Sequence, residues 1–117
     1  MLRLCYTHVR ENGWRELRLP DEKASAILLA KQVLQKNMLP QLLVLQPGGT
    51  THLERTKPGC EKWLCVLEGA VEVQVGERHD RLTRSGTLYF NASQPHQLMN
   101  AGKMTATCTR VTSPVGL

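Results

Sequence analysis

Apolar and polar residues alternate with a period of two in the segment VEVQV, residues 71–75. The valines share one face, while Glu72 and Gln74 occupy the other, which is the pattern of a strand with one buried face. A helix, with its 3.6-residue period, does not sort such a series onto two sides. The segment therefore predicts β structure for the chain around it.

Glycine, proline and asparagine divide the chain on both sides of this segment into short pieces of the same kind. Gly69 predicts a bend or bulge, and Gly76, at the centre of VGERHD, predicts a hairpin turn. Further strand-like pieces are QLLVL, TLYF, HQLMN and TATCTRVT, separated by QPGG, NASQP and NAGK. Many short strands with such turns predict an all-β sandwich or barrel.

The segment PDEKASAILLAKQVLQKN, residues 20–37, allows two interpretations. Its Pro-Asp-Glu start and the spacing of its apolar residues predict one short helix. The same stretch, SAILLAKQVL, is also compatible with a pair of strands in an N-terminal extension. The family resemblance described below favours the strands.

Length and composition predict one domain with an ordinary core. The chain has 117 residues, a net charge of +5 and basic residues spread along its length, so no clustered stripe for nucleic acid is present. No secretory signal is evident at the start, and no apolar run is long enough to span a bilayer. Four cysteines form no C-x-x-C pair. We therefore expect a cytoplasmic protein that binds neither nucleic acid nor membrane.

Two longer stretches carry a family resemblance. HLERTKPGCEKWLCVLEGAVEVQVG followed by LTRSGTLYFNASQPHQLMNAG resembles the two sequence motifs of the cupin superfamily, as found in small single-domain cupins. The first motif has a glutamate seven residues before a glycine; with Gly69 as that glycine, Lys62 stands at the glutamate position. The second motif ends in H-x(3)-N, which His96 and Asn100 match.

The resemblance implies the fold. We expect an all-β, single-domain cupin jelly-roll barrel (a double-stranded β-helix), in which residues 41–117 form the barrel. Residues 1–40 are expected to be an N-terminal extension of the same domain, with strands or one short helix. Open sheet edges and the apolar extension further predict a homodimer.

The resemblance also implies a site inside the barrel mouth. Many cupins hold iron, manganese, nickel, zinc or copper there, whereas some members lack metal and bind a ligand or protein. His52 and Glu54 are two residues apart, so in a strand both reach the same side, and His96 completes a set of three. The expected metal ligands are His52, Glu54 and His96, and the expected ligand-binding residues are Lys62, Leu64, Leu98 and Asn100.

Lys62 is the departure from the family pattern, because an ammonium group repels a divalent cation. A bulge at Pro58-Gly59-Cys60 would turn Glu61 inward as a metal ligand and Lys62 outward. Alternatively Lys62 pairs with Glu54 inside the barrel, or it faces inward to meet an anionic ligand as an acid or base. The last two hypotheses, which we favour over the bulge, both predict a weak or absent metal site.

These observations lead to three functional hypotheses. The first is a small-molecule-binding cupin whose ligand is anionic and whose metal site is weak or altered. The second is a metal-dependent oxygenase, isomerase or lyase that acts on a small anionic substrate with iron, manganese, nickel or zinc. The third is an effector-binding regulatory module. The sequence identifies no catalytic residue.

Overall fold

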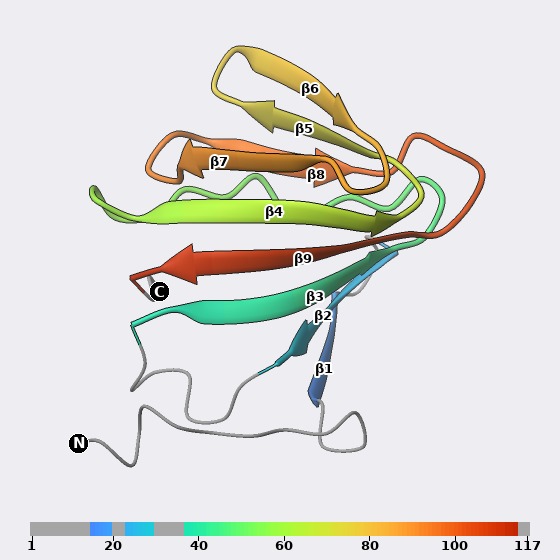
Figure 1. The fold of residues 1–117 in the computed structure, drawn as a ribbon, viewed down its shortest axis with the longest axis horizontal. Coiled ribbons are helices and arrows are strands. Elements are labelled where there is room, and N and C mark those ends of the chain that lie inside the picture. Colours follow the sequence, from blue (N-terminus) through green and yellow to red (C-terminus); the bar gives the residue numbers. More distant parts are fainter. Residues whose placement is uncertain (1–14, 20–22, 30–36, 115–117) are drawn as a thin grey trace.

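The computed structural model of the chain describes residues 15–19, 23–29 and 37–114. These residues form two antiparallel sheets that face each other (Figure 1). The strands are β1 (Arg15–Leu19), β2 (Ala24–Leu28), β3 (Leu39–Leu45), β4 (Glu61–Glu68), β5 (Val71–Val75), β6 (Arg78–Leu82), β7 (Thr87–Asn91), β8 (His96–Met99) and β9 (Ala106–Ser113).

The larger sheet has six strands in the order β1-β2-β3-β9-β4-β7, and the smaller sheet has the order β6-β5-β8. Single bridges from Thr50 to Met99 and from Glu54 to His96 place the segment between β3 and β4 beside β8. The non-consecutive neighbours, such as β3 beside β9, are those of a jelly roll and not of a simple meander. The expected all-β jelly-roll barrel is confirmed.

The predicted strands and turns are present. QLLVL, VEVQV and TLYF lie within strands, and HQLMN and TATCTRVT do so except for Asn100 and Thr105; the β5–β6 hairpin turns at Gly76 with a φ of 57°. Gly69 ends β4 with a φ of 74°, and a Cβ there would lie 2.9 Å from the carbonyl oxygen of Thr105. Glycine is therefore required at position 69 by both the backbone angle and the close approach of Thr105 and Ala106 at the start of β9.

The N-terminal segment follows the strand interpretation where the structure describes it. Residues 24–28 are strand β2, which pairs with β3 and with β1 at the edge of the larger sheet. The prediction for residues 30–36 lies outside the described residues. The described residues form no helix, and hence none that is long and apolar enough to cross a membrane.

The interior between the sheets has two chemically different ends. At one end the inward residues are apolar, and we call this set the apolar end: Leu43, Leu45, Leu64, Val66, Val71, Val73, Leu98, Ala106 and Cys108. At the other end of the same strands the inward residues are polar and equally buried, and we call this set the polar end: Gln41, Lys62, His96, Arg110 and Thr112. The candidate site lies at the polar end.

Candidate functional site

Glu54 and His96 are brought together by backbone pairing. The Glu54 N–H donates to the His96 carbonyl at 2.8 Å, and the His96 N–H donates to the Glu54 carbonyl at 2.9 Å. Two residues that exchange both hydrogen bonds lie directly opposite each other, so their side chains leave the sheet on the same face. Although Glu54 belongs to no regular strand, its carboxylate is thereby fixed beside the imidazole of His96.

Lys62 enters the site from the larger sheet. It is only 4% exposed, whereas its neighbours Glu61 and Trp63 are on the outer side of β4. The register of β4 is regular from Glu61 to Val66. The less favoured alternative, a bulge at residues 58–60 that turns Glu61 inward, is not observed; the register shift lies between Val66 and Glu68 instead.

The Lys62 ammonium group bridges the two sheets. Its Nζ lies 2.8 Å from Glu54 Oε2 and 2.8 Å from His96 Nε2. The other ring nitrogen, His96 Nδ1, lies 2.8 Å from the carbonyl oxygen of Gln94, which can only accept a hydrogen bond. Nδ1 therefore carries the proton of the neutral ring, and the lone pair at Nε2 points toward Lys62. Phe90 packs edge-on against the imidazole, with ring centroids 5.1 Å apart.

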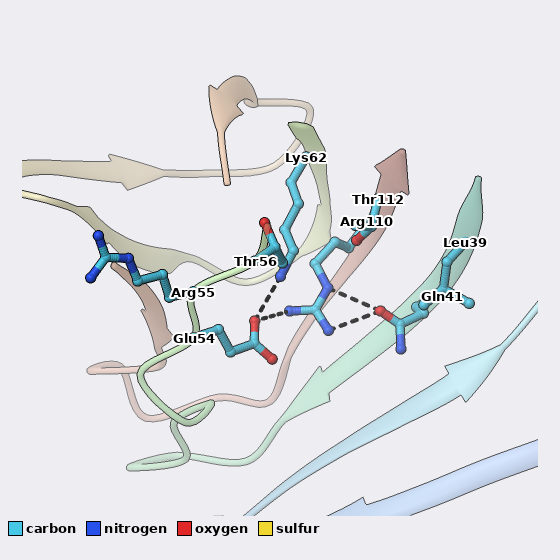
Figure 2. Close-up of a pocket in the computed structure, with 8 residues that line it drawn as sticks. All are labelled: Leu39, Gln41, Glu54, Arg55, Thr56, Lys62, Arg110 and Thr112. Atoms are coloured by element: carbon cyan, nitrogen blue, oxygen red, sulfur yellow. Dashed lines mark hydrogen bonds and ion pairs between the residues drawn. The ribbon is translucent and has the colours of Figure 1, made fainter. Parts of the chain in front are cut away.

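Arg110 supplies a second buried cation to the same carboxylate. Its Nη1 donates to Glu54 Oε2 at 3.0 Å, while Nε and Nη2 both donate to Gln41 Oε1, at 3.1 and 2.8 Å (Figure 2). Gln41 and Arg110 lie opposite each other on the paired strands β3 and β9. The amide thus holds the guanidinium in one plane, with Nη1 directed at Glu54.

The charges in this cluster displace two pKa values. Burial alone would raise the pKa of Glu54, but the charges of Arg110 and Lys62 and the hydrogen bond from Lys62 hold that pKa well below its usual range. Burial lowers the pKa of Lys62, and the Arg110 charge lowers it further, while Glu54 opposes both effects. At neutral pH the cluster contains two cationic groups against one carboxylate, and it therefore has an excess of positive charge.

The cluster forms the floor of a pocket of about 360 Å³. The lining residues are Leu39, Gln41, Glu54, Arg55, Thr56, Lys62, Arg110 and Thr112, all drawn in Figure 2. The hydroxyl oxygen of Thr56 is buried and has no hydrogen-bond partner among the described residues. A buried hydroxyl without a partner favours an additional polar group in the pocket, such as a water molecule or a ligand atom.

Of the predicted ligand-binding residues, Lys62 lines this pocket and the other three do not. Leu64 and Leu98 are 1% and 0% exposed and belong to the hydrophobic core; they follow Lys62 and His96, respectively, by two residues on the same strand. Asn100 lies just beyond β8, where its Nδ2 donates to the carbonyl oxygens of Leu45 and Met104. Its Oδ1 accepts from the Gly102 N–H, so Asn100 holds the loop that leads to β9.

Sequence analysis missed Arg110, Gln41 and Thr56. Arg110 was detectable, because it alternates with Cys108 on an inward face of TATCTRVT, where a charged residue is unusual. Gln41 follows from Arg110 only once β3 and β9 are known to be neighbours. Nothing in the sequence around Thr56 indicates that its hydroxyl would be buried.

The residues at the family's metal position do not fit a divalent ion in this geometry. Within the described ranges, no three His, Cys, Asp or Glu side chains are grouped so that they could hold one ion, and the exposed His52 does not join Glu54 and His96 in such a group. Oε2 of Glu54 is bound by two cations, and Nε2 of His96 faces the Lys62 ammonium. A metal ion at this position would lie next to the positive charges of Lys62 and Arg110, which would repel it.

The chain belongs to the cupin family: the family described as "Cupin domain" matches residues 41–112. A comparison of the sequence with curated proteins gives no match. Among solved structures, a protein from Thermus thermophilus is similar with a TM-score of 0.73 and 28% identity, over 92% of this chain and 98% of that one.

Two other solved structures share the fold at lower identity. A predicted oxalate decarboxylase from Thermotoga maritima has a TM-score of 0.78 and 15% identity, over 93% of this chain and all of that one (100%). The cupin domain of a transcriptional regulator from Enterobacter cloacae has a TM-score of 0.73 and 14% identity, over 78% of this chain and 96% of that one. Because the same fold occurs in proteins described so differently, the fold alone assigns no function to this chain.

Proposed function

We propose that this cupin binds a small anionic molecule in the pocket at the polar end of the barrel. The observation that supports this function is the convergence of Lys62 and Arg110 on a single carboxylate oxygen, at 2.8 and 3.0 Å. Both cations are buried, so their charge is poorly screened by water, and one carboxylate neutralises only one of them. A carboxylate or phosphate group of a ligand would neutralise the remaining positive charge.

Hydrogen-bond donors for such a group are present. A guanidinium has five N–H donors, of which Arg110 uses three on Glu54 and Gln41. The remaining two N–H groups have no partner among the described residues. Together with the Thr56 hydroxyl, they provide donors on the wall of the pocket, and an anion bound there would satisfy them.

The function is tested by isothermal titration calorimetry with two probes, oxalate and inorganic phosphate. We expect Arg110→Met to weaken binding at least tenfold, about 1.4 kcal/mol, because it removes the buried charge and its free donors. Glu54→Gln should strengthen binding, since it removes the carboxylate that already occupies the two cations. The matched control is Arg78→Met, which changes an exposed arginine on β6 and should leave the affinity unchanged.

Opposite shifts for Arg110→Met and Glu54→Gln would support the function. Circular dichroism melts verify that both variants remain folded at the titration temperature. If wild-type protein binds neither probe at low ionic strength, where charge attraction is strongest, the proposed function is wrong.

We also propose that the chain forms a homodimer. Strand β1 lies at an edge of the larger sheet, and Trp63 and Tyr89, which are 37% and 63% exposed, are opposite each other on the neighbouring strands β4 and β7. Edge strands and exposed aromatic side chains are common in interfaces. Light scattering at micromolar concentration tests the assembly, and a monomer alone would contradict it.

A further inference from the structure

We propose that Lys62 is a nucleophilic amine that captures a small oxo-carboxylate, such as a 2-oxo acid, as an imine within this pocket. The inference rests on the proposed function, because the positive pocket is what would hold the carboxylate. It adds a covalent step, and with it a class of ligand in which a carbonyl carbon is bonded directly to the carboxylate.

The surroundings of Nζ provide what an amine nucleophile requires. An ammonium group cannot attack a carbonyl, so the lysine must first lose a proton to a base within hydrogen-bond distance. His96 Nε2 is such a base, 2.8 Å away, and its lone pair points at Nζ because Nδ1 donates to Gln94.

The relative position of Arg110 and Lys62 selects the ligand. Both side chains reach the same oxygen, Glu54 Oε2, so a carboxylate held by the two N–H groups of Arg110 that bind no described residue would lie close to Nζ. In a 2-oxo acid the carbonyl carbon is adjacent to the carboxylate carbon. Binding the carboxylate on Arg110 therefore brings that carbonyl carbon within reach of the amine.

The step balances without any further reactant. One Nζ proton moves to His96 Nε2, and the amine nitrogen then forms a bond to the carbonyl carbon. A second nitrogen proton moves to the former carbonyl oxygen, which gives a carbinolamine. The proton on His96 returns to that hydroxyl group, the C–O bond breaks, and water leaves as the protonated C=N bond forms. Glu54 Oε2, 3.4 Å from Nε2, stabilises the imidazolium while it lasts.

The test is reductive trapping. The full chain is incubated with pyruvate and sodium cyanoborohydride, which converts an imine to a stable secondary amine, and the product is analysed by intact mass and peptide mapping. We expect one adduct, on Lys62. Lys62→Arg keeps the charge beside Glu54 but cannot form an imine, so the adduct should disappear in this variant. Lys57→Arg, which changes an exposed lysine close in sequence, should leave the adduct unaffected.

A second variant tests the base. His96→Gln keeps a polar side chain but cannot accept and return a proton, so the rate of trapping should fall about 100-fold, a typical size for general acid–base catalysis. Circular dichroism verifies that the variant is folded. An unchanged trapping rate in folded His96→Gln protein would overturn the proton transfer through His96.

The outcomes separate this inference from the proposed function. If oxalate binds but pyruvate leaves no adduct on Lys62, the imine is ruled out and the anion-binding function stands. Adducts spread over exposed lysines such as Lys57 and Lys103, without enrichment at Lys62, would also overturn the inference. If neither binding nor trapping occurs, both proposals are wrong.

Discussion

The two ends of the barrel interior are built on the same strands and differ only in where along each strand the inward residue lies. On β4, Lys62 is at the polar end and Leu64 is at the apolar end; on β9, Arg110 and Cys108 stand in the same relation. All four side chains are almost completely buried. The β-strand alternation determines that they point inward, and the side chains alone determine the chemistry of each end.

The two ends also contribute differently to stability. Burying a leucine side chain stabilises the fold by about 2 kcal/mol relative to leaving it exposed. Burying an ion pair contributes little or nothing compared with apolar residues of the same size, because each ion loses its hydration. The polar end is therefore not explained by stability, and binding is the reason we give for its presence.

The largest expected effect belongs to the apolar end. Leu64→Ala should lower the free energy of unfolding by about 3 kcal/mol, because the side chain is 1% exposed and its loss leaves a cavity. Below the melting transition the affinity for oxalate should remain at the wild-type value. Urea denaturation and calorimetry measure the two quantities.

A matched change on the outer face of β4 provides the control. Leu67→Ala, at a position 42% exposed, should change the free energy of unfolding much less than Leu64→Ala. A large loss of oxalate affinity in folded Leu64→Ala protein would show that the two ends are coupled, which would break the comparison.

At the polar end, Glu54→Gln should lower the free energy of unfolding by about 2 kcal/mol at pH 7, because two buried cations lose their counterion while part of the side chain remains solvated. The pKa of Glu54 is lowered in the folded state, so the unfolded chain binds its proton first as pH falls. The stabilisation by this carboxylate is therefore full above an ordinary glutamate pKa of about 4.3 and is lost below it.

The difference in the free energy of unfolding between wild type and Glu54→Gln should therefore become smaller when denaturation is measured at successively lower pH, from pH 6 to pH 2. Glu61→Gln, at an exposed position on β4, serves as the control and should give a small difference at every pH. A difference for Glu54→Gln that stays constant over this range would contradict the ion-pair interpretation.

The smallest expected effect is on the affinity for a divalent metal ion. Lys62→Glu removes a repelling charge and places a second carboxylate beside Glu54 and His96, so the affinity for manganese, nickel or zinc should rise at least tenfold, about 1.4 kcal/mol. Calorimetric titration of purified protein measures the change. Glu61→Gln should again have no effect, and metal affinity unchanged by Lys62→Glu would show that charge at this position does not limit metal binding.

The β structure and the shared face of Lys62, Leu64 and Val66 were predictable from a local period of two, whereas the jelly roll and the inward direction of that face were implied by the resemblance to cupins. The pattern KWLCV alone places Lys62 with Leu64 and Val66, and the structure has all three buried. The pairing of Lys62 with Glu54 was one of the alternatives the sequence left open, and the structure shows it at 2.8 Å.

The rest of the site depends on which strands are neighbours, and the local pattern does not contain that information. Gln41 and Arg110 are 69 residues apart in the chain and meet only because β3 pairs with β9. The alternating pattern also does not indicate how far an inward residue lies from the pocket. Leu98 was therefore expected to bind a ligand, whereas it belongs to the hydrophobic core. The match of Asn100 to a family motif likewise did not reveal that its amide binds backbone groups.

Glu54 lies on a segment joined to β8 by isolated bridges and not by a continuous ladder. Its carboxylate is held against Lys62 and Arg110 by the chain itself, so it would compete as an intramolecular ligand with any anion that enters the pocket. A ligand would have to carry more charge than Glu54, or make more contacts, in order to replace it at Lys62 and Arg110. On the proposed function, monovalent ions of the solvent that bind weakly would therefore not displace Glu54.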